Sequence, residues 1–218
     1  MQQREELIAY CHKVYEKNFV SAYDGNLSVR TPNGTILITR SAVCKGDVTG
    51  SDILEMDING NIISGSGKIS TENKLHLFIY KNRNDVKAVV HAHPVYATAF
   101  ASARESLDRP VFPEVILTLG RIPLCKYATP STDELPDSLK THINYANVFL
   151  LENHGAVSVG VNVKQAYFRM EKLEHTAKTI FIAGKLGGIK EIPKYKLDAL
   201  YSVAEKSYGI KLDEKNKF

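Results

Sequence analysis

Three histidines in this chain have the types and spacing of a metal site. His91 and His93 follow the apolar run Ala88–Val90, and a β-branched run of this kind predicts a strand. Side chains alternate between the two faces of a strand, so the imidazoles of His91 and His93 point to the same side. His154 follows a second apolar run, Val148–Leu151. Three imidazoles that leave one coordination position open form the ligand set of a catalytic zinc site.

The alternative is three unrelated histidines, two of them buried and hydrogen-bonded in the core. A His-x-His pair alone favours that interpretation. Two further features favour the metal site, because a second apolar strand ends in Asn153-His154-Gly155 and a carboxylate, Glu72, lies just inside a predicted helix. Zinc suits such borderline ligands, and cobalt or manganese can replace it.

The elements that must position these residues follow from hydrophobic periodicity. Helices are predicted at 2–19, from 70 to about 82, from about 94, at 132–144, from about 164 to 183, and at 197–207. Strands are predicted at 27–31, 35–39, 53–58, 61–64, 87–92, 122–125, 148–151 and 156–159, with a loop at 106–113. Hairpin turns at Pro32-Asn33-Gly34 and Asn59-Gly60 join the early strands. The pattern predicts an α/β fold of the α+β type, with one domain over 1–218 and a mostly antiparallel central sheet flanked by helices.

The composition argues against several classes of partner. The chain has 44% hydrophobic and 24% charged residues, as an ordinary globular domain has, and no apolar run long enough to span a membrane. The net charge of +4 is spread along the chain without a basic helix, so we expect no nucleic-acid partner. Cys11, Cys44 and Cys125 lack CxxC spacing and suit a reducing compartment. The N-terminus lacks signal-peptide features, and we expect a cytoplasmic protein.

A glycine-rich segment, Gly65-Ser66-Gly67-Lys68, has part of a phosphate-loop pattern. A P-loop requires Ser or Thr directly after the lysine and an earlier glycine, but Ile69 and Ile62 occupy these positions. We therefore reject nucleotide binding by this segment. Ser70 and Thr71 still offer hydroxyl and N–H groups at a helix start, which favours an anion. A plain helix cap is the alternative.

Five short motifs, taken together, resemble the class II aldolase/adducin family. They occur in the family's order: Gly25–Ser28 (GNLS), Thr39–Ala42 (TRSA), Ser70–Glu72 (STE), His91–His93 (HAH) and Asn153–Gly155 (NHG). This order, over roughly residues 5–185, is far more specific than any one motif. Within the family the chain resembles the L-fuculose-1-phosphate aldolases.

The resemblance implies a zinc-dependent lyase. Zinc would be held by His91, His93 and His154, and Glu72 would complete the metal shell of the empty site and act as acid/base. The substrate phosphate would bind at Gly25, Asn26, Ser41, Ala42, Ser70 and Thr71. The implied reaction cleaves a phosphorylated ketose, an L-fuculose-1-phosphate-like ketose 1-phosphate, to dihydroxyacetone phosphate and an aldehyde. The resemblance also implies a homotetramer with C4 symmetry, in which the tail from about residue 186 could contact a neighbouring subunit.

The chain departs from the aldolase pattern at three positions. Thr71 replaces a serine and keeps its hydroxyl, whereas Ala42 replaces a glycine where the backbone approaches the phosphate. Glu114 falls where the aldolases carry a catalytic tyrosine from a neighbouring subunit, and similar phosphosugar dehydratases carry a glutamate there. We expect Glu114 to act as a second acid/base, with a solvated loop acid as the alternative. Tyr201 and Tyr208 are candidates for reaching a neighbour's site.

Other functions on the same scaffold stay open. A phosphosugar dehydratase or 4-epimerase is one alternative, although epimerases of the family carry aspartate where Glu72 stands. A non-catalytic, adducin-like scaffold is another, but it would not need the intact histidines and Glu72. Four further histidines receive no metal role: His12, His76, His142 and His175. His76 lies one helical turn after Glu72 and either supports the site or is an ordinary partly buried histidine.

Overall fold

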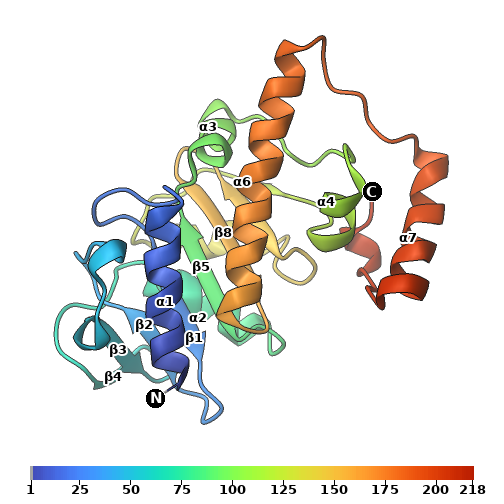
Figure 1. The fold of residues 1–218 in the computed structure, drawn as a ribbon. Helices are drawn as coiled ribbons and strands as arrows, with labels where there is room; N and C mark the ends of the chain where they lie inside the picture. Colours follow the sequence, from blue (N-terminus) through green and yellow to red (C-terminus); the bar gives the residue numbers. More distant parts are fainter. Residues whose placement is uncertain (1) are drawn as a thin grey trace.

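A sheet of eight strands forms the centre of the molecule (Figure 1). The computed structural model describes residues 2–218, except for the side chain of Tyr208. In spatial order the strands are β4 (Ile62–Ser64), β3 (Ile53–Met56), β2 (Ile36–Thr39), β1 (Asn26–Arg30), β5 (Ala88–Ala92), β8 (Gly155–Gly160), β7 (Val148–Leu151) and β6 (Leu124–Cys125). Among these described strands only β6 and β7 pair in parallel, so the predicted mostly antiparallel sheet is confirmed.

Helices pack on both faces of this sheet. The helices are α1 (Gln2–Glu16), α2 (Asn73–Asn82), α3 (Val95–Ala103), α4 (Pro113–Thr118), α5 (Glu134–Ser138), α6 (Val163–Lys185) and α7 (Lys194–Tyr208). Short 3-10 helices follow at η1 (Lys45–Asp47), η2 (Gly50–Asp52) and η3 (Glu214–Asn216). In these described residues no helix has an apolar stretch long enough to cross a bilayer.

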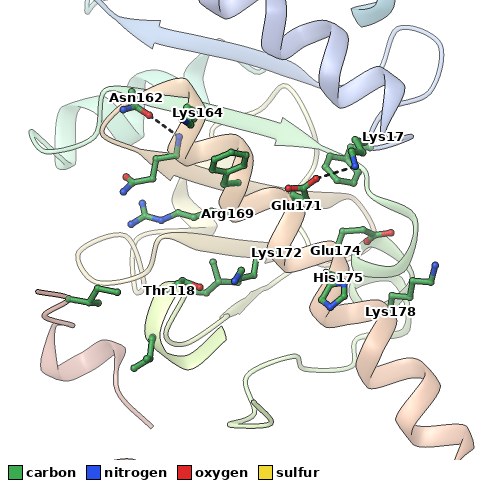
Figure 2. Close-up of a pocket in the computed structure, with 16 residues that line it drawn as sticks. Lys17, Thr118, Asn162, Lys164, Arg169, Glu171, Lys172, Glu174, His175 and Lys178 are labelled. Atoms are coloured by element: carbon green, nitrogen blue, oxygen red, sulfur yellow. Dashed lines mark hydrogen bonds and ion pairs between the residues drawn. The ribbon is translucent and has the colours of Figure 1, made fainter. Parts of the chain in front are cut away.

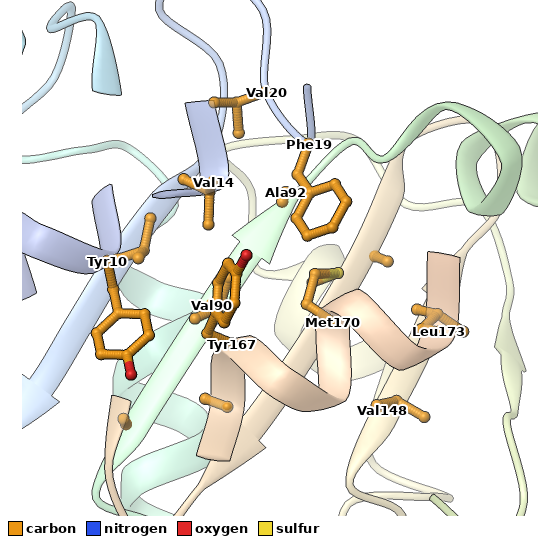
Figure 3. Close-up of a cluster of buried hydrophobic side chains, with 14 of the residues drawn as sticks. Tyr10, Val14, Phe19, Val20, Val90, Ala92, Val148, Tyr167, Met170 and Leu173 are labelled. Carbon is orange, nitrogen blue, oxygen red and sulfur yellow. The ribbon is translucent and has the colours of Figure 1, made fainter. Parts of the chain in front are cut away.

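The period of two along the strands divides the core into two clusters. One cluster lies between the sheet and α1 and α6, where Val90 and Ala92 of β5 meet Tyr10, Tyr167 and other apolar side chains (Figure 3). The second cluster lies between the sheet and α2 and α5, and it takes Val89 from the same strand. His91 has the parity of Val89, so its ring lies on the α2 side, where Glu72 is the N-cap residue directly before α2.

One prediction of local structure is wrong, and one helix was not predicted. The helix predicted over 132–144 is limited to Glu134–Ser138, and successive hydrogen-bonded turns continue to Ala146. These turns bury Leu139 and Ile143 as well as a helix would, so the apolar spacing alone overestimated the helix length. The helix α4 was not predicted and begins directly at the end of the expected loop. Its signal is Pro113, since proline favours the first position of a helix.

The C-terminal segment forms an arm that leaves the end of α6 and returns to α4 (Figure 1). Asn216 is 1% exposed, its Oδ1 accepts from Arg121 N at 2.9 Å, and its Nδ2 donates to Leu119 O at 3.2 Å. The expected tail from about residue 186 therefore packs on its own chain, next to α4. Tyr201 Oη accepts a hydrogen bond from the backbone N–H of Phe218 at 2.8 Å. The side chain of Tyr208 lies outside the described part of the structure.

Candidate active site

The three predicted ligands lie together at the end of β5. His91 and His93 come from this strand and the residues after it, and His154 comes from the turn between β7 and β8. The Nε2 atoms of His91 and His93 are 3.2 Å apart, and one ligand nitrogen from each of the three rings lies within 4.8 Å of the others. Tetrahedral zinc, with bonds of about 2.0–2.1 Å, separates its ligand nitrogens by roughly 3.3 Å. The cluster therefore fits a divalent cation.

The surrounding residues fix the orientation of these rings. His91 Nδ1 lies 3.0 Å from the carbonyl oxygen of Ala156, which places the ring hydrogen there and leaves Nε2 free to ligate. A side chain at Gly155 would lie 2.4 Å from the His93 ring, so only glycine lets β8 approach it. Asn153 makes the preceding turn with a φ of 54°, a conformation that asparagine tolerates. In the Asn-His-Gly motif, the turn at Asn153 thus positions His154, and Gly155 leaves space for the ring of His93.

The chemistry of the donor set also fits a cation. Burial lowers the pKa of both His91 and His93 to about 4, so both rings are neutral near pH 7. His91, whose ring hydrogen lies on Nδ1, presents the lone pair of its Nε2 toward His93 Nε2, and either a bound cation or the Nε2–H tautomer of His93 satisfies this contact. The Nδ1 atom of His154 is buried and has no hydrogen-bond partner within the described chain.

Glu72 stands among the histidines. Its Oε2 lies 3.3 Å from His91 Nε2, and its Oε1 lies 3.1 Å from His154 Nε2. Burial opposes its ionisation, but the nearby His91 and hydrogen bonds from His154 and Asn26 outweigh burial and lower the pKa of the carboxyl group. An ionised carboxylate in this position can complete a metal shell or accept a proton.

The expected phosphate-binding residues come from three segments. Asn26 is paired with His91 across β1 and β5, and its Nδ2 donates to Ser70 Oγ at 3.3 Å. At Gly25, where φ is 70°, a side chain would lie 2.7 Å from the carbonyl oxygen of His91. The backbone N–H of Ser41 donates to the carbonyl of Lys68 at 2.8 Å. This bond brings the segment with Ser41 and Ala42 beside the segment with Ser70 and Thr71.

Two of these residues have distinct environments. Ala42 has a φ of 56°, in the left-handed region that favours glycine, the residue that the resemblance implies at this position. Thr71 is exposed, and its Oγ1 accepts a hydrogen bond from Ser131 Oγ at 2.7 Å rather than bonding to Asn26 or Ser70. The amide hydrogens of Asn26 already face Glu72 and Ser70. A phosphate bound by this amide would have to replace one of these partners.

Among residues 2–218, Glu114 does not belong to the cluster that the three histidines form with Glu72. It is exposed in the first turn of α4, and within residues 2–218 it forms no ion pair with the cluster. Its position is compatible with the expected role in a neighbouring subunit and equally with a solvated loop acid.

Sequence reasoning missed two buried residues that are linked to Asn26 by hydrogen-bond contacts through His76, namely Ser28 and Tyr80. Ser28 lies two residues after Asn26 on β1, so its side chain shares the face of Asn26, and the period of the strand could have indicated this. Tyr80 lies one turn after His76 on α2 and is fully buried. His76 is also fully buried and contacts Asn26, the residue whose amide donates to Glu72.

A large groove lies elsewhere, on the outer side of α6 (Figure 2). Its volume is about 970 Å³, and Lys17, Leu117, Lys172 and His175 are among its lining residues. Glu171 in this groove pairs with Lys17 at 3.4 Å. None of the predicted site residues lines it, so its size does not indicate the reaction centre.

Comparison with known proteins identifies the family of this chain. Residues 5–181 match the model of the family described as Class II Aldolase and Adducin N-terminal domain. The chain belongs to this family. Its structural relatives include an L-fuculose 1-phosphate aldolase, with a TM-score of 0.84, 32% identity, and coverage of 94% of this chain and 95% of that one. YgbL from Klebsiella pneumoniae, described as an aldolase/epimerase/decarboxylase, has a TM-score of 0.85 at 30% identity. The match covers 91% of this chain and 97% of YgbL.

Relatives within this class II aldolase family carry two different activities. A 3-oxo-tetronate 4-phosphate decarboxylase of Pectobacterium atrosepticum is 36% identical over 186 residues, which cover 83% of this chain and 84% of the relative. An L-fuculose phosphate aldolase of Methanococcus maripaludis is 35% identical over 181 residues, covering 83% and 97%. The family relatives named here are enzymes that act on phosphorylated substrates, and their reactions differ.

Proposed function

We propose that this protein is a metal-dependent aldolase that cleaves an L-fuculose-1-phosphate-like ketose 1-phosphate to dihydroxyacetone phosphate and an aldehyde. The observation that carries the proposal is the position of Glu72. This ionised carboxylate lies within 3.3 Å of two histidine ligands and beside the amide and hydroxyl groups of Asn26 and Ser70. Metal ligands, an acid/base and anion donors then lie on one side of the sheet.

His91, His93 and His154 would hold the metal, with Glu72 as a fourth ligand in the resting site. Bound zinc, or cobalt or manganese in its place, would act as a Lewis acid toward the carbonyl oxygen of the substrate. Donors near Asn26, Ser41 and Ser70 would fix the phosphate and thereby orient the ketose.

Aldol cleavage breaks one carbon–carbon bond and needs two proton transfers. The hydroxyl proton of the leaving half passes to a base, and the electron pair of the broken bond stays with the three-carbon ketone half. Glu72 is placed to carry the proton that this carbon gains in cleavage and loses in condensation. Glu114 of a neighbouring subunit is our candidate for the base at the hydroxyl group.

Decarboxylation of a phosphorylated 3-oxo acid is the second candidate, and the identity to the decarboxylase of Pectobacterium atrosepticum favours it. Loss of CO₂ from such an acid leaves an electron pair on the same three-carbon fragment, so the metal site and Glu72 would serve both reactions. The difference lies at the leaving group, because CO₂ departs without a hydroxyl proton. A carboxylate from Glu114 near the leaving group would assist aldol cleavage and would repel a substrate carboxylate.

A product assay distinguishes these reactions. The zinc-loaded protein is incubated with a panel of ketose 1-phosphates and, separately, with 3-oxo-tetronate 4-phosphate. We expect dihydroxyacetone phosphate with an equal amount of aldehyde from a ketose 1-phosphate. Dihydroxyacetone phosphate and CO₂ from the oxo acid alone would assign the decarboxylase reaction. A dehydrated or 4-epimerised product would assign one of the other reactions expected on this scaffold.

We also propose a C4 homotetramer whose sites lie between subunits, and a cytoplasmic location. The exposed Glu114 supports the shared site, because its carboxylate forms no ion pair or side-chain hydrogen bond with the described residues of its own chain. The free thiols Cys11, Cys44 and Cys125 support the reducing compartment. Sedimentation equilibrium at micromolar concentration should give the mass of four chains, and an active monomer would contradict the shared site.

A further inference from the structure

A buried chain of hydrogen bonds runs from the core to Glu72. Asn26 is 4% exposed, and Ser28, His76 and Tyr80 are fully buried. Asn26 and Ser28 share one face of β1, and His76 and Tyr80 lie one turn apart on α2. A strand and a helix thus contribute two polar side chains each to a line of contacts inside an apolar cluster.

The end nearest the site has only one consistent arrangement of hydrogens. Asn26 Nδ2 lies 2.6 Å from Glu72 Oε2, and Asn26 Oδ1 lies 2.5 Å from His76 Nε2. A carboxylate only accepts, so the NH₂ group of Asn26 faces Glu72 and its carbonyl group faces His76. This carbonyl also only accepts, so His76 Nε2 carries the ring hydrogen.

The far end requires the same tautomer. Ser28 Oγ lies 2.6 Å from His76 Nδ1 and 2.8 Å from Tyr80 Oη. A neutral ring with its hydrogen on Nε2 accepts at Nδ1, so Ser28 donates to His76 and accepts from Tyr80. Burial lowers the pKa of His76 to about 4, which agrees with a neutral ring. Every hydrogen along the chain then points toward Glu72.

We propose that His76 is a positioning residue for Glu72. It holds the Asn26 amide in the one orientation that presents NH₂ to the carboxylate, and through this amide it fixes Glu72 between His91 and His154. Without the donor of His76 the amide can turn by 180° and present its carbonyl oxygen, which repels the carboxylate. The inference rests on the proposed function for the catalytic use of Glu72, whereas the positioning belongs to the folded chain.

Position 76 offers a matched pair of variants. His76→Gln keeps an N–H group near the place of Nε2, whereas His76→Asn keeps a group near Nδ1 and is too short to reach Asn26. The readout is the dissociation constant for Co²⁺, measured by competition with a chromogenic chelator, with a thermal melt to confirm folding. We expect His76→Asn to weaken Co²⁺ binding about tenfold, the scale for losing a group that orients a metal ligand. His76→Gln should stay within about threefold of the unmodified protein.

A double-mutant cycle with Glu72→Gln distinguishes positioning from general loosening of the core. If His76 acts through Glu72, His76→Asn adds no further loss of Co²⁺ affinity to that of Glu72→Gln. A further tenfold loss in the double variant, or an unchanged affinity in His76→Asn, would overturn the proposal.

Ser28→Ala carries the test if His76→Asn does not fold. This variant keeps the contact between His76 and Asn26 but removes the hydroxyl group that donates to His76 Nδ1. The ring hydrogen is then no longer held on Nε2, so we expect Co²⁺ binding to weaken about twofold to fivefold. An unchanged affinity in this variant would then overturn the proposal. Because the readout is metal affinity, a lack of lyase activity on every substrate would refute the proposed function and leave this result standing.

Discussion

The two regions proposed to take part in catalysis, around Glu72 and around Glu114, differ in how many of their contacts come from one chain. Around Glu72, on the α2 side of the sheet, polar side chains are buried and contact one another at hydrogen-bond distances. At the start of α4 the carboxylate of Glu114 is exposed. The C-terminal arm contacts the residues that follow α4, where Asn216 is hydrogen-bonded to the backbone of Leu119 and Arg121. In the region around Glu72, one chain supplies all of these contacts, so its chemistry can be argued from a single subunit. The exposed carboxylate of Glu114 would need a neighbouring subunit to take part in the reaction.

The largest expected effect comes from removing a metal ligand in the buried region. His93→Ala should lower metal affinity by roughly 1,000-fold, since one of a few ligands carries a large share of the binding free energy. Metal analysis after gel filtration should show loss of most of the metal, and turnover should fall with it. Full metal occupancy in this variant would remove His93 from the ligand set.

Glu72→Gln tests the acid/base of the same region. The amide keeps the shape of the side chain but cannot carry the proton, so kcat should fall by roughly a hundredfold or more. Phosphate affinity, measured with inorganic phosphate, and the thermal midpoint should change little. Near-normal kcat would assign proton transfer to another residue, with Glu114 the first to test.

Glu114→Gln tests whether the exposed region belongs to a shared site. We expect kcat to fall by about 10- to 100-fold, with little change in phosphate affinity, as for loss of one acid/base. Mixing inactive His93→Ala subunits with Glu114→Gln subunits should then restore part of the activity, because some shared sites would receive both intact groups. No recovery after subunit exchange, together with a silent Glu114→Gln, would leave Glu114 as a loop acid.

The smallest expected effect concerns backbone strain beside the buried region. Ala42 has a φ of 56°, so Ala42→Gly should raise the free energy of unfolding by about 1 kcal/mol. For a chain of this size the thermal midpoint would rise by about 2–4 °C. Ala22→Gly is the matched control, since Ala22 has a φ of 45° and no expected phosphate contact. A tighter inorganic phosphate complex in Ala42→Gly alone would support Ala42 as part of the phosphate site.

Local patterns in the sequence determined much of the fold and the ligand set. The period of two along 88–92 predicted that His91 and His93 share a face, and the structure places both rings in one cluster. Turn and strand signals likewise located the hairpins and most strands, because these signals act within a few residues. The same local spacing failed at 132–144, where buried turns satisfy the apolar pattern of a helix.

Only the tertiary structure decided which distant groups meet. The register of β1 and β5 sets Asn26 beside His91, and the packing of α2 brings Glu72 and His76 to the same place. The sequence left His76 open between a supporting and an ordinary buried role, since its distance from Asn26 depends on how a helix packs on a strand. Hydrophobic periodicity reports which face of an element is buried, but not which polar group from another element lies opposite. That choice comes from strand pairing and helix packing over the whole chain, and it placed the carboxylate among the three histidines.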